Sequence, residues 1–386
     1  QTQAETTAQL HEKKFLPGFA EDAWETASLD SKTELAKQLA AYELAMLGVP
    51  DGTEVTVQPL DEDRLGYYSA ASRQIVLSRS VLESGTAQET MDTIAHEAFH
   101  VQQAYVVENI DWPCEVHRMY QEKNFGCDPS EFICQRWAFS IVDKCIVLED
   151  DDVPTQSFFR YCQEMLDRYA DDERIGMIQG CNFEERTDDV PSSSYFFTSN
   201  FCVSGWASWA RVVNNWDEHY SWLDSPEAVS RIEALVKERK LRPDFLPMAR
   251  AHKASGKAHY ETIYYAHMLL NSQLSVIPCL NLVNNIGVIE ESAHFNGGVQ
   301  SLPSGYRRIF TMKRYDLEFP LRHPAHVIDH VAYRQRIYRI VGWGHPWVKA
   351  YRSMEELFIN LRHGQWSYIG KAIANRFSII FRGRKF

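Results

Sequence analysis

The sequence predicts an α/β fold, and two strand-to-helix patterns together with the composition support that expectation. RQIVLS (73–78) is typical of a short strand, and the helical pattern of residues 86–106 follows it. CIVLED (145–150) is a second apolar run, and the spacing in 153–169 predicts a helix that begins after Pro154. An apolar fraction of 45% over 386 residues is enough for more than one domain with a sizeable core.

Net charge and cysteine content exclude several classes of protein. The formal net charge of −12 argues against a nucleic-acid binder, which normally carries a basic face. The eight cysteines include no Cys-x-x-Cys pair, so we expect reduced, mostly buried thiols and a cytoplasmic protein. No apolar run is long enough to span a membrane. Because the chain begins with glutamine, we expect a fragment or a processed chain.

The C-terminal residues 331–386 are predicted to form a basic helical tail. From Val341 to Phe386 there are eight Lys or Arg against two Glu, although the whole chain is acidic. Its last stretch, IGKAIANRFSIIFRGRKF, mixes bulky apolar residues with basic ones. This pattern predicts either peripheral contact with the inner face of a membrane or a basic helix that packs on its own acidic domain.

Segment 86–106, TAQETMDTIAHEAFHVQQAYV, is predicted to be a helix with a marked beginning. Thr86 followed by Glu89 matches a capping box, in which each side chain satisfies a free N–H of the first turn. Residues four apart lie on one face of a helix, so His96 and His100 can face the same tetrahedral ion. Glu97 then lies where a carboxylate can take a proton from zinc-bound water.

HEAFH (96–100) therefore predicts a Zn²⁺ site that still needs a third protein ligand. With the strand that precedes the helix, residues 50–107 resemble small zincin-like metallopeptidase domains. The remaining ligand is expected from a later acidic residue, and the candidates are Glu108, Glu115, Glu122 and Glu131.

The acidic run after CIV predicts a second, different metal site. Glu149, Asp150 and Asp151 are expected at the carboxyl end of a strand, where open α/β sheets place their ligands. Adjacent carboxylates repel one another unless a cation neutralises them. Oxygen ligands suit Mn²⁺ or Mg²⁺ together with a diphosphate.

Five blocks of sequence occur in a fixed order around this run. Together they resemble a bacterial family of glycosyltransferases with the GT-A fold, labelled hemolysin- or hemolytic-protein-like. The resemblance covers about residues 108–330 and implies a Rossmann-like mixed sheet. The blocks are WPCEVHRMYQEKNFGC (112–127), IVLEDDDVPTQSFFRYCQEMLDRY (146–169), FCVSGWASWARVVNNWD (201–217), LSVIPCLNLVNNIG (274–287) and PLRHPAHV (320–327).

The resemblance implies roles for individual residues of the donor and acceptor sites. Glu149-Asp150-Asp151 matches the family's Glu-Asp-Asp, whose last acid binds the metal that bridges the phosphates of a nucleotide-sugar donor. Gly205-Trp206 matches a Gly-Trp turn that lines the acceptor side. Glu261 stands where the family has a catalytic base, and Asp217 is the alternative base.

One departure from the family concerns the beginning of the fold. The family opens with a strand-helix-strand unit that holds the nucleotide, and residues 1–107, the zincin-like segment, occupy that place. A fusion of two damaged genes, an artificially joined reading frame and an N-terminal domain that replaces the missing unit all account for this.

Three functions follow from these patterns. The first is a metal-dependent, inverting glycosyltransferase that moves a sugar from a nucleotide-sugar donor to a glycan or lipid-linked acceptor. The second is a zinc metallopeptidase that acts through HEAFH, and the third is an inactive hybrid that only binds a glycan or a sugar nucleotide.

Overall fold

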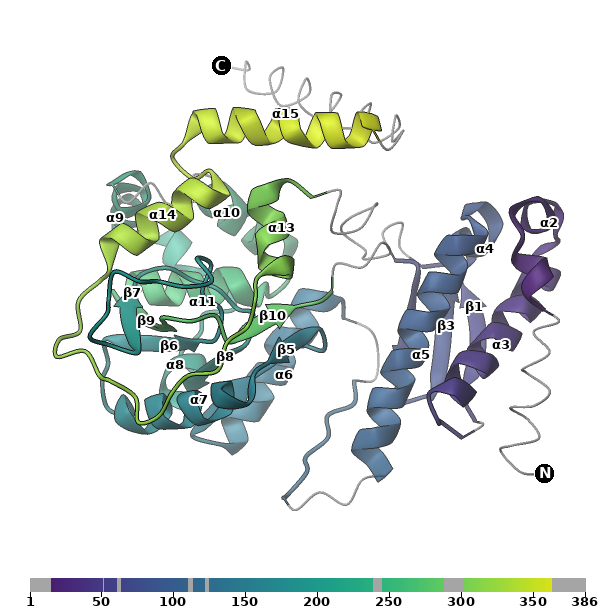
Figure 1. The fold of residues 1–386 in the computed structure, drawn as a ribbon, viewed down its shortest axis with the longest axis horizontal. Helices are drawn as coiled ribbons and strands as arrows, with labels where there is room; N and C mark the ends of the chain where they lie inside the picture. The colour runs from purple at the N-terminus through teal and green to yellow at the C-terminus, as the bar shows by residue number, and fades with distance from the viewer. Residues whose placement is uncertain are drawn as a thin grey trace. The chain divides into compact units, whose positions relative to one another are not determined.

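The computed structural model divides the chain into two compact units, which are considered separately (Figure 1). The division falls between Asn124 and Phe125, whereas the sequence patterns suggested a boundary after residue 107. Both units combine helices with mixed sheets, so the predicted α/β class is confirmed. The structure describes residues 15–50, 52–60, 64–109, 114–121, 125–238, 245–287 and 302–362.

The first unit is a small sheet packed against helices. β3 lies in the centre of the sheet, parallel to β1 and antiparallel to β2. The predicted strand and the helix that follows it are confirmed as β3 and α5. The elements are η1 (Leu16–Phe19), α2 (Glu21–Thr26), α3 (Leu29–Met46), β1 (Glu54–Gln58), β2 (Gly66–Ser69), β3 (Gln74–Ser78), α4 (Arg79–Ser84) and α5 (Ala87–Asn109).

The beginning of α5 is fixed by the capping box that the sequence predicted. The Thr86 backbone N–H donates to Glu89 Oε2 at 2.8 Å, and the Glu89 N–H donates to Thr86 Oγ1 at 3.1 Å. Ile94, Ala98 and Val101 then face the core, because their spacing places them on one side of the helix.

The second unit is built on a five-stranded mixed sheet. The strand order is β4-β8-β6-β9-β7; β4, β6 and β9 point one way, and β8 and β7 run antiparallel to them. A separate two-stranded ribbon pairs β5 with β10. The strands are β4 (Lys144–Val147), β5 (Asp152–Pro154), β6 (Ile175–Gln179), β7 (Tyr195–Thr198), β8 (Trp206–Trp209), β9 (Leu274–Pro278) and β10 (Val283–Asn285).

Helices surround this sheet and bury most of its strands (Figure 1). The helix predicted to begin after Pro154 is confirmed as α7, with Phe158, Cys162 and Met165 fully buried. The elements are α6 (Cys127–Ile141), α7 (Gln156–Arg168), α8 (Ala210–Val213), η2 (Ser221–Asp224), α9 (Pro226–Glu238), α10 (Phe245–Ser255), α11 (Tyr260–Leu270), α13 (Ser304–Thr311), α14 (Val331–Val341) and α15 (Pro346–Arg362).

β4 differs from the other strands of the five-stranded sheet. Every residue of β6, β7 and β8 is buried, whereas Lys144 is exposed and the rest of β4 is half-buried. Within the described residues, β4 pairs only with β8 and therefore ends the sheet.

The predicted basic tail is described only in part. α14 and α15 belong to the second unit, and residues 363–386 lie outside the described part of the chain. None of the helices in the described ranges is both long enough and apolar enough to cross a bilayer.

Candidate functional site

The acidic run forms a turn between β4 and β5, and Asp152 anchors it. Asp152 Oδ2 accepts hydrogen bonds from the Gly205 N–H at 2.7 Å and from the Glu149 N–H at 3.2 Å. Gly205 has a φ of +60°, in the left-handed region that favours glycine, and this conformation turns its N–H toward the carboxylate. Asp152 Oδ1 is buried without a hydrogen-bond partner.

The end of β10 holds Asp151 from the other side. Asn285 Nδ2 donates to Asp151 Oδ1 at 2.6 Å, and the Ile286 N–H donates to the Asp151 carbonyl at 2.9 Å. A β-carbon at Gly287 would lie 1.8 Å from Asp151 Oδ2, so only glycine allows this close approach. Asp150, the middle acid of the run, is exposed to solvent.

Glu149 points toward Tyr260, the first residue of α11. The Tyr260 hydroxyl donates to Glu149 Oε1 at 2.9 Å. Burial, and then the neighbouring Glu131 carboxylate, raise the pKa of Glu149 to about 8, although the hydrogen bond from Tyr260 opposes this. Burial likewise raises the pKa of Glu131 on α6 to about 7.

Glu261, the predicted catalytic base, lies in the same acidic neighbourhood. It is exposed in the first turn of α11, and its charge raises the pKa values of Glu131 and Tyr260. Asp128 near the beginning of α6 also contributes and pairs with His259, with Oδ2 and Nδ1 3.2 Å apart. The structure therefore brings Glu149 to the first turn of α11, where Glu261 stands, although 111 residues separate Glu149 from Tyr260 in the sequence.

The chemistry of this acidic site fits a hard divalent cation. Burial raises the pKa of Asp152 to about 6, and the charged neighbours that raise it further are the carboxylates of Asp151 and Asp150. A cation would relieve this repulsion and would find only oxygen donors on Asp150 and Asp151. Within the described residues no group of three or more His, Cys, Asp or Glu is arranged to enclose a metal. One or two carboxylates, with water and phosphate completing the coordination, is how proteins commonly bind Mg²⁺.

Trp206 has a different environment from the acceptor-lining position that the resemblance implied. Its side chain is 0% exposed and packs in the core between Phe139 and Tyr264, with ring centroids at 6.3 Å and 5.2 Å. The indole contributes to the core, while Gly205 beside it contributes its backbone N–H to the acidic turn.

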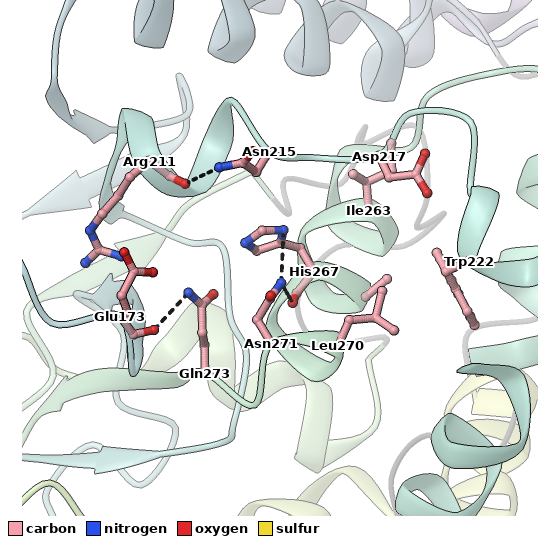
Figure 2. Close-up of a pocket in the computed structure, with 11 residues that line it drawn as sticks. Glu173, Arg211, Asn215, Asp217, Trp222, Ile263, His267, Leu270, Asn271 and Gln273 are labelled. Carbon is pink, nitrogen blue, oxygen red and sulfur yellow. Dashed lines mark hydrogen bonds between the residues drawn. The ribbon is translucent and has the colours of Figure 1, made fainter. Parts of the chain in front are cut away.

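Asp217, the alternative base, caps a turn. Its Oδ2 accepts from the Ser221 N–H at 2.6 Å and from Ser221 Oγ at 2.7 Å. It lines a cavity of about 330 Å³ that also contains Arg211, His267 and Trp222 (Figure 2).

Part of this cavity lies at the opposite end of the strands from the acidic turn. Glu173 and Gln273 line it (Figure 2) and lie in the chain just before β6 and β9. The acidic turn instead follows β4, which is parallel to β6 and β9. Asp217 has no hydrogen bond or ion pair with the acidic turn among the described residues. Burial, and then the charges of Asp128 and Asp217, nevertheless raise the pKa of Tyr220, whose hydroxyl donates to the His259 carbonyl just before α11.

In the first unit, His96 and His100 lie side by side on α5. Their Nε2 atoms are 3.0 Å apart, and His100 Nδ1 lies 2.9 Å from the Gln103 side-chain oxygen. Because an amide oxygen only accepts, His100 Nδ1 carries the proton and leaves its Nε2 lone pair facing His96. Two ligands of one tetrahedral zinc ion lie about 3.3 Å apart, so the pair has nearly the geometry of half a zinc site.

The residues expected to complete the zinc site are elsewhere. Glu97 is 6% exposed, on the buried side of α5. Glu108 accepts from Arg73 and Tyr120, Glu115 pairs with His117, and Glu122 lies outside the described residues. Glu131 belongs to the second unit, beside Glu149.

Comparison with known proteins adds no relative. No protein-family model matches the chain, and no curated protein matches it. The assignment of a function therefore depends on the two sites themselves.

Four residues of the acidic site were not predicted as parts of it: Asn285, Gly287, Tyr260 and Glu131. The first two stand in the block LSVIPCLNLVNNIG, and the strand pattern gave no reason to pair its end with the acidic run. Glu131 was considered only as a zinc ligand. An acidic residue on a helix is usually solvated, so only the burial of Glu131 in the folded structure identifies it as part of the acidic site.

Proposed function

We propose that the second unit is a metal-dependent glycosyltransferase that moves a sugar from a nucleotide-sugar donor to a glycan or lipid-linked acceptor. The observation that carries the proposal is the acidic turn Glu149–Asp152, held at the carboxyl end of β4 by Asn285 and by the Gly205 backbone. Ligand sites of open α/β sheets lie at that end of the strands.

The architecture supports a GT-A-like core that lacks its first strand-helix-strand unit. In the proposed fold, the missing strands would continue the sheet beyond β4. β4 ends the described sheet, and its residues are half-buried or exposed, as expected for a strand whose neighbour is absent. The mixed direction of the strands, with β8 antiparallel between β4 and β6, agrees with the Rossmann-like mixed sheet that the resemblance implies.

Asp151, with Asp150 beside it, would hold the Mn²⁺ or Mg²⁺ ion. The bound ion supplies positive charge to the diphosphate that leaves the sugar. Asn285 orients the Asp151 carboxylate by donating to Oδ1. Gly287 lies so close to Asp151 Oδ2 that a side chain at this position would displace the carboxylate.

Glu261 is the base that the proposal assigns to the reaction. It is exposed at the first turn of α11 and can accept the proton of an acceptor hydroxyl. The hydroxyl oxygen then bonds to the anomeric carbon as the bond to the diphosphate breaks, which inverts that centre. Because Glu131 and Glu149 have pKa values of about 7 and 8, one or both stay protonated near neutral pH and add little charge against a Glu261 carboxylate.

A thermal-shift experiment tests the proposal on the full chain. We expect Mn²⁺ with one of UDP, GDP, CMP or dTDP to raise the Tm, because a ligand that binds only the folded state stabilises it by mass action. Asp151→Asn should abolish the rise, whereas Asp171→Asn, at an exposed position before β6, should keep it. A sugar-transfer assay with the matching donor should show the same pattern. No shift with any of the four nucleotides would contradict the proposal.

The second candidate function is a zinc metallopeptidase in the first unit, and the His96–His100 geometry favours it. The 3.0 Å separation of the two Nε2 atoms and the Gln103 partner of His100 are the arrangement that a metal-binding histidine pair needs. Among the described residues, none is positioned beside this pair as a third protein ligand.

Dialysis and a peptidase assay distinguish this candidate from the first. Zinc retained in stoichiometric amount, lost in His96→Gln and kept in His117→Gln, would favour the metallopeptidase. Glu97→Gln should then abolish peptide hydrolysis and leave sugar transfer intact. Zinc that is removed completely by dialysis, with no peptide hydrolysis, would exclude it.

A further inference from the structure

α15 directs its apolar face outward. Trp347, Tyr351, Met354 and Phe358 are 85%, 69%, 65% and 72% exposed. Their spacing of four, three and four residues places them in one stripe along the helix. Most helices of a folded protein bury such a stripe, and a contiguous exposed one marks an interaction surface.

The polar side of α15 faces the rest of the second unit and fixes this orientation. Arg352 Nη1 donates to the Val341 carbonyl at the end of α14 at 2.7 Å. Glu355 accepts from the Ser304 N–H and hydroxyl at the beginning of α13, both at 3.2 Å (Figure 1). Turning the stripe inward would break these bonds, so its exposure follows from the way the helix is attached.

The charge of the C-terminal segment indicates what kind of partner binds the stripe. The segment from Val341 to Phe386 has eight Lys or Arg against two Glu, in a chain of net charge −12. On α15 itself, Lys349 and Arg362 are exposed. The chain is acidic as a whole, and the sequence segment that contains α15 is basic.

We propose that α15 binds in the plane of a membrane surface that contains anionic lipids. Trp347 and Tyr351 are the amphipathic side chains that favour the membrane–water interface, and Met354 and Phe358 would enter the acyl boundary below the headgroups. The basic residues of the C-terminal segment would be attracted to anionic headgroups. Apolar and electrostatic contributions together are what in-plane helices need for stable binding.

Charge also disfavours a second copy of the chain as the occupant. A dimer formed through the stripe would bring two positively charged C-terminal segments together, and like charges repel. The membrane proposal is independent of the proposed reaction, because a chain without transferase activity would still bind vesicles.

Vesicle flotation of the full chain tests the proposal. We expect it to float with vesicles of phosphatidylcholine mixed with phosphatidylglycerol, and to bind vesicles of phosphatidylcholine alone at least about tenfold more weakly. The double variant Trp347→Ser, Phe358→Ser should weaken binding to the anionic vesicles by at least about tenfold. Ile328→Ser, which changes another apolar residue that is 68% exposed, should leave binding unchanged.

Quenching of tryptophan fluorescence tests whether α15 lies at the bilayer surface. Brominated phospholipid should quench the fluorescence of the wild-type chain more than that of Trp347→Phe, because Trp347 would lie at the membrane–water interface, close to the brominated acyl chains. A chain that stays unbound with both vesicle types overturns the proposal. A concentration-dependent dimer in sedimentation would also overturn the proposal, if the double variant is a monomer and neither chain binds vesicles.

Discussion

At the scale of single residues, Glu131 and Glu149 of the second unit depart from ordinary solution chemistry. Both are half-buried carboxyl groups, and the Tyr260 hydroxyl donates to Glu149. Burial, and then the Asp128 and Glu261 carboxylates, raise the pKa of Glu131 to about 7; burial, and then the Glu131 carboxylate, raise the pKa of Glu149 to about 8, so a change in pH near neutrality alters the charge of the candidate site.

The raised pKa of Glu131 predicts that the second unit loses stability as pH rises. Between an ordinary glutamate pKa of about 4.5 and about 7, the folded state keeps a proton that the unfolded state has released. The free energy of unfolding therefore falls with increasing pH across this window. Glu131→Gln should make the urea midpoint less dependent on pH between 5 and 8, about its titration range.

Glu233→Gln, at an exposed position on α9, is the matched control and should keep the wild-type slope. A slope that is the same in all three chains would show that Glu131 titrates normally.

The burial of Trp206 leads to a second prediction at this scale. Trp206→Ala should lower the free energy of unfolding by about 3–5 kcal/mol, because it leaves a large cavity in the core. Trp347→Ala, which removes an indole that is 85% exposed, should change stability by about 0.5 kcal/mol or less. Denaturant unfolding of both variants measures the difference. A small loss of unfolding free energy in Trp206→Ala would contradict the core position and would favour the acceptor-lining position that the resemblance implies.

At the scale of elements, local sequence patterns predicted those whose cause is local. β3, α5, β4 and α7 were expected from apolar spacing and turn residues, and each is present. The pairing of β5 with β10 was not expected. Its partners Asp152 and Asn285 stand far apart in the sequence, and a local pattern does not indicate which distant strand a given strand pairs with.

The capping box of α5 gives a prediction for the first unit. Thr86→Ala should destabilise it by about 1 kcal/mol, because the Glu89 N–H loses its acceptor at the beginning of the helix. Thr33→Ala within α3 should cost about 0.5 kcal/mol or less, since alanine has the higher helix propensity there. Helix content measured by circular dichroism against urea tests both. Equal costs would show that the box contributes nothing beyond an ordinary threonine.

At the scale of the whole molecule, the two units have separate sheets and separate cores. We therefore expect two transitions in differential scanning calorimetry of the full chain. Mn²⁺ with the binding nucleotide should raise the transition that Trp206→Ala lowers, by about 2.7 kcal/mol of stability at a hundredfold excess over Kd. It should leave the transition that Thr86→Ala lowers in place. One cooperative transition would contradict the independence of the units.

The sequence by itself determined the α/β class, the capping box, the strand before HEAFH and the placement of the acidic run after a strand. Each depends on residues within a few positions of one another, where spacing and turn chemistry dominate. Only the tertiary structure decided that Asn285 and Gly287 hold Asp151, that Glu131 and Tyr260 surround Glu149, and that Trp206 is core. It also decided that the stripe of α15 faces outward, because contacts with α13 and α14 choose which side of a helix is covered. Burial and long-range pairing depend on the whole fold, and the same local pattern is compatible with several of their outcomes.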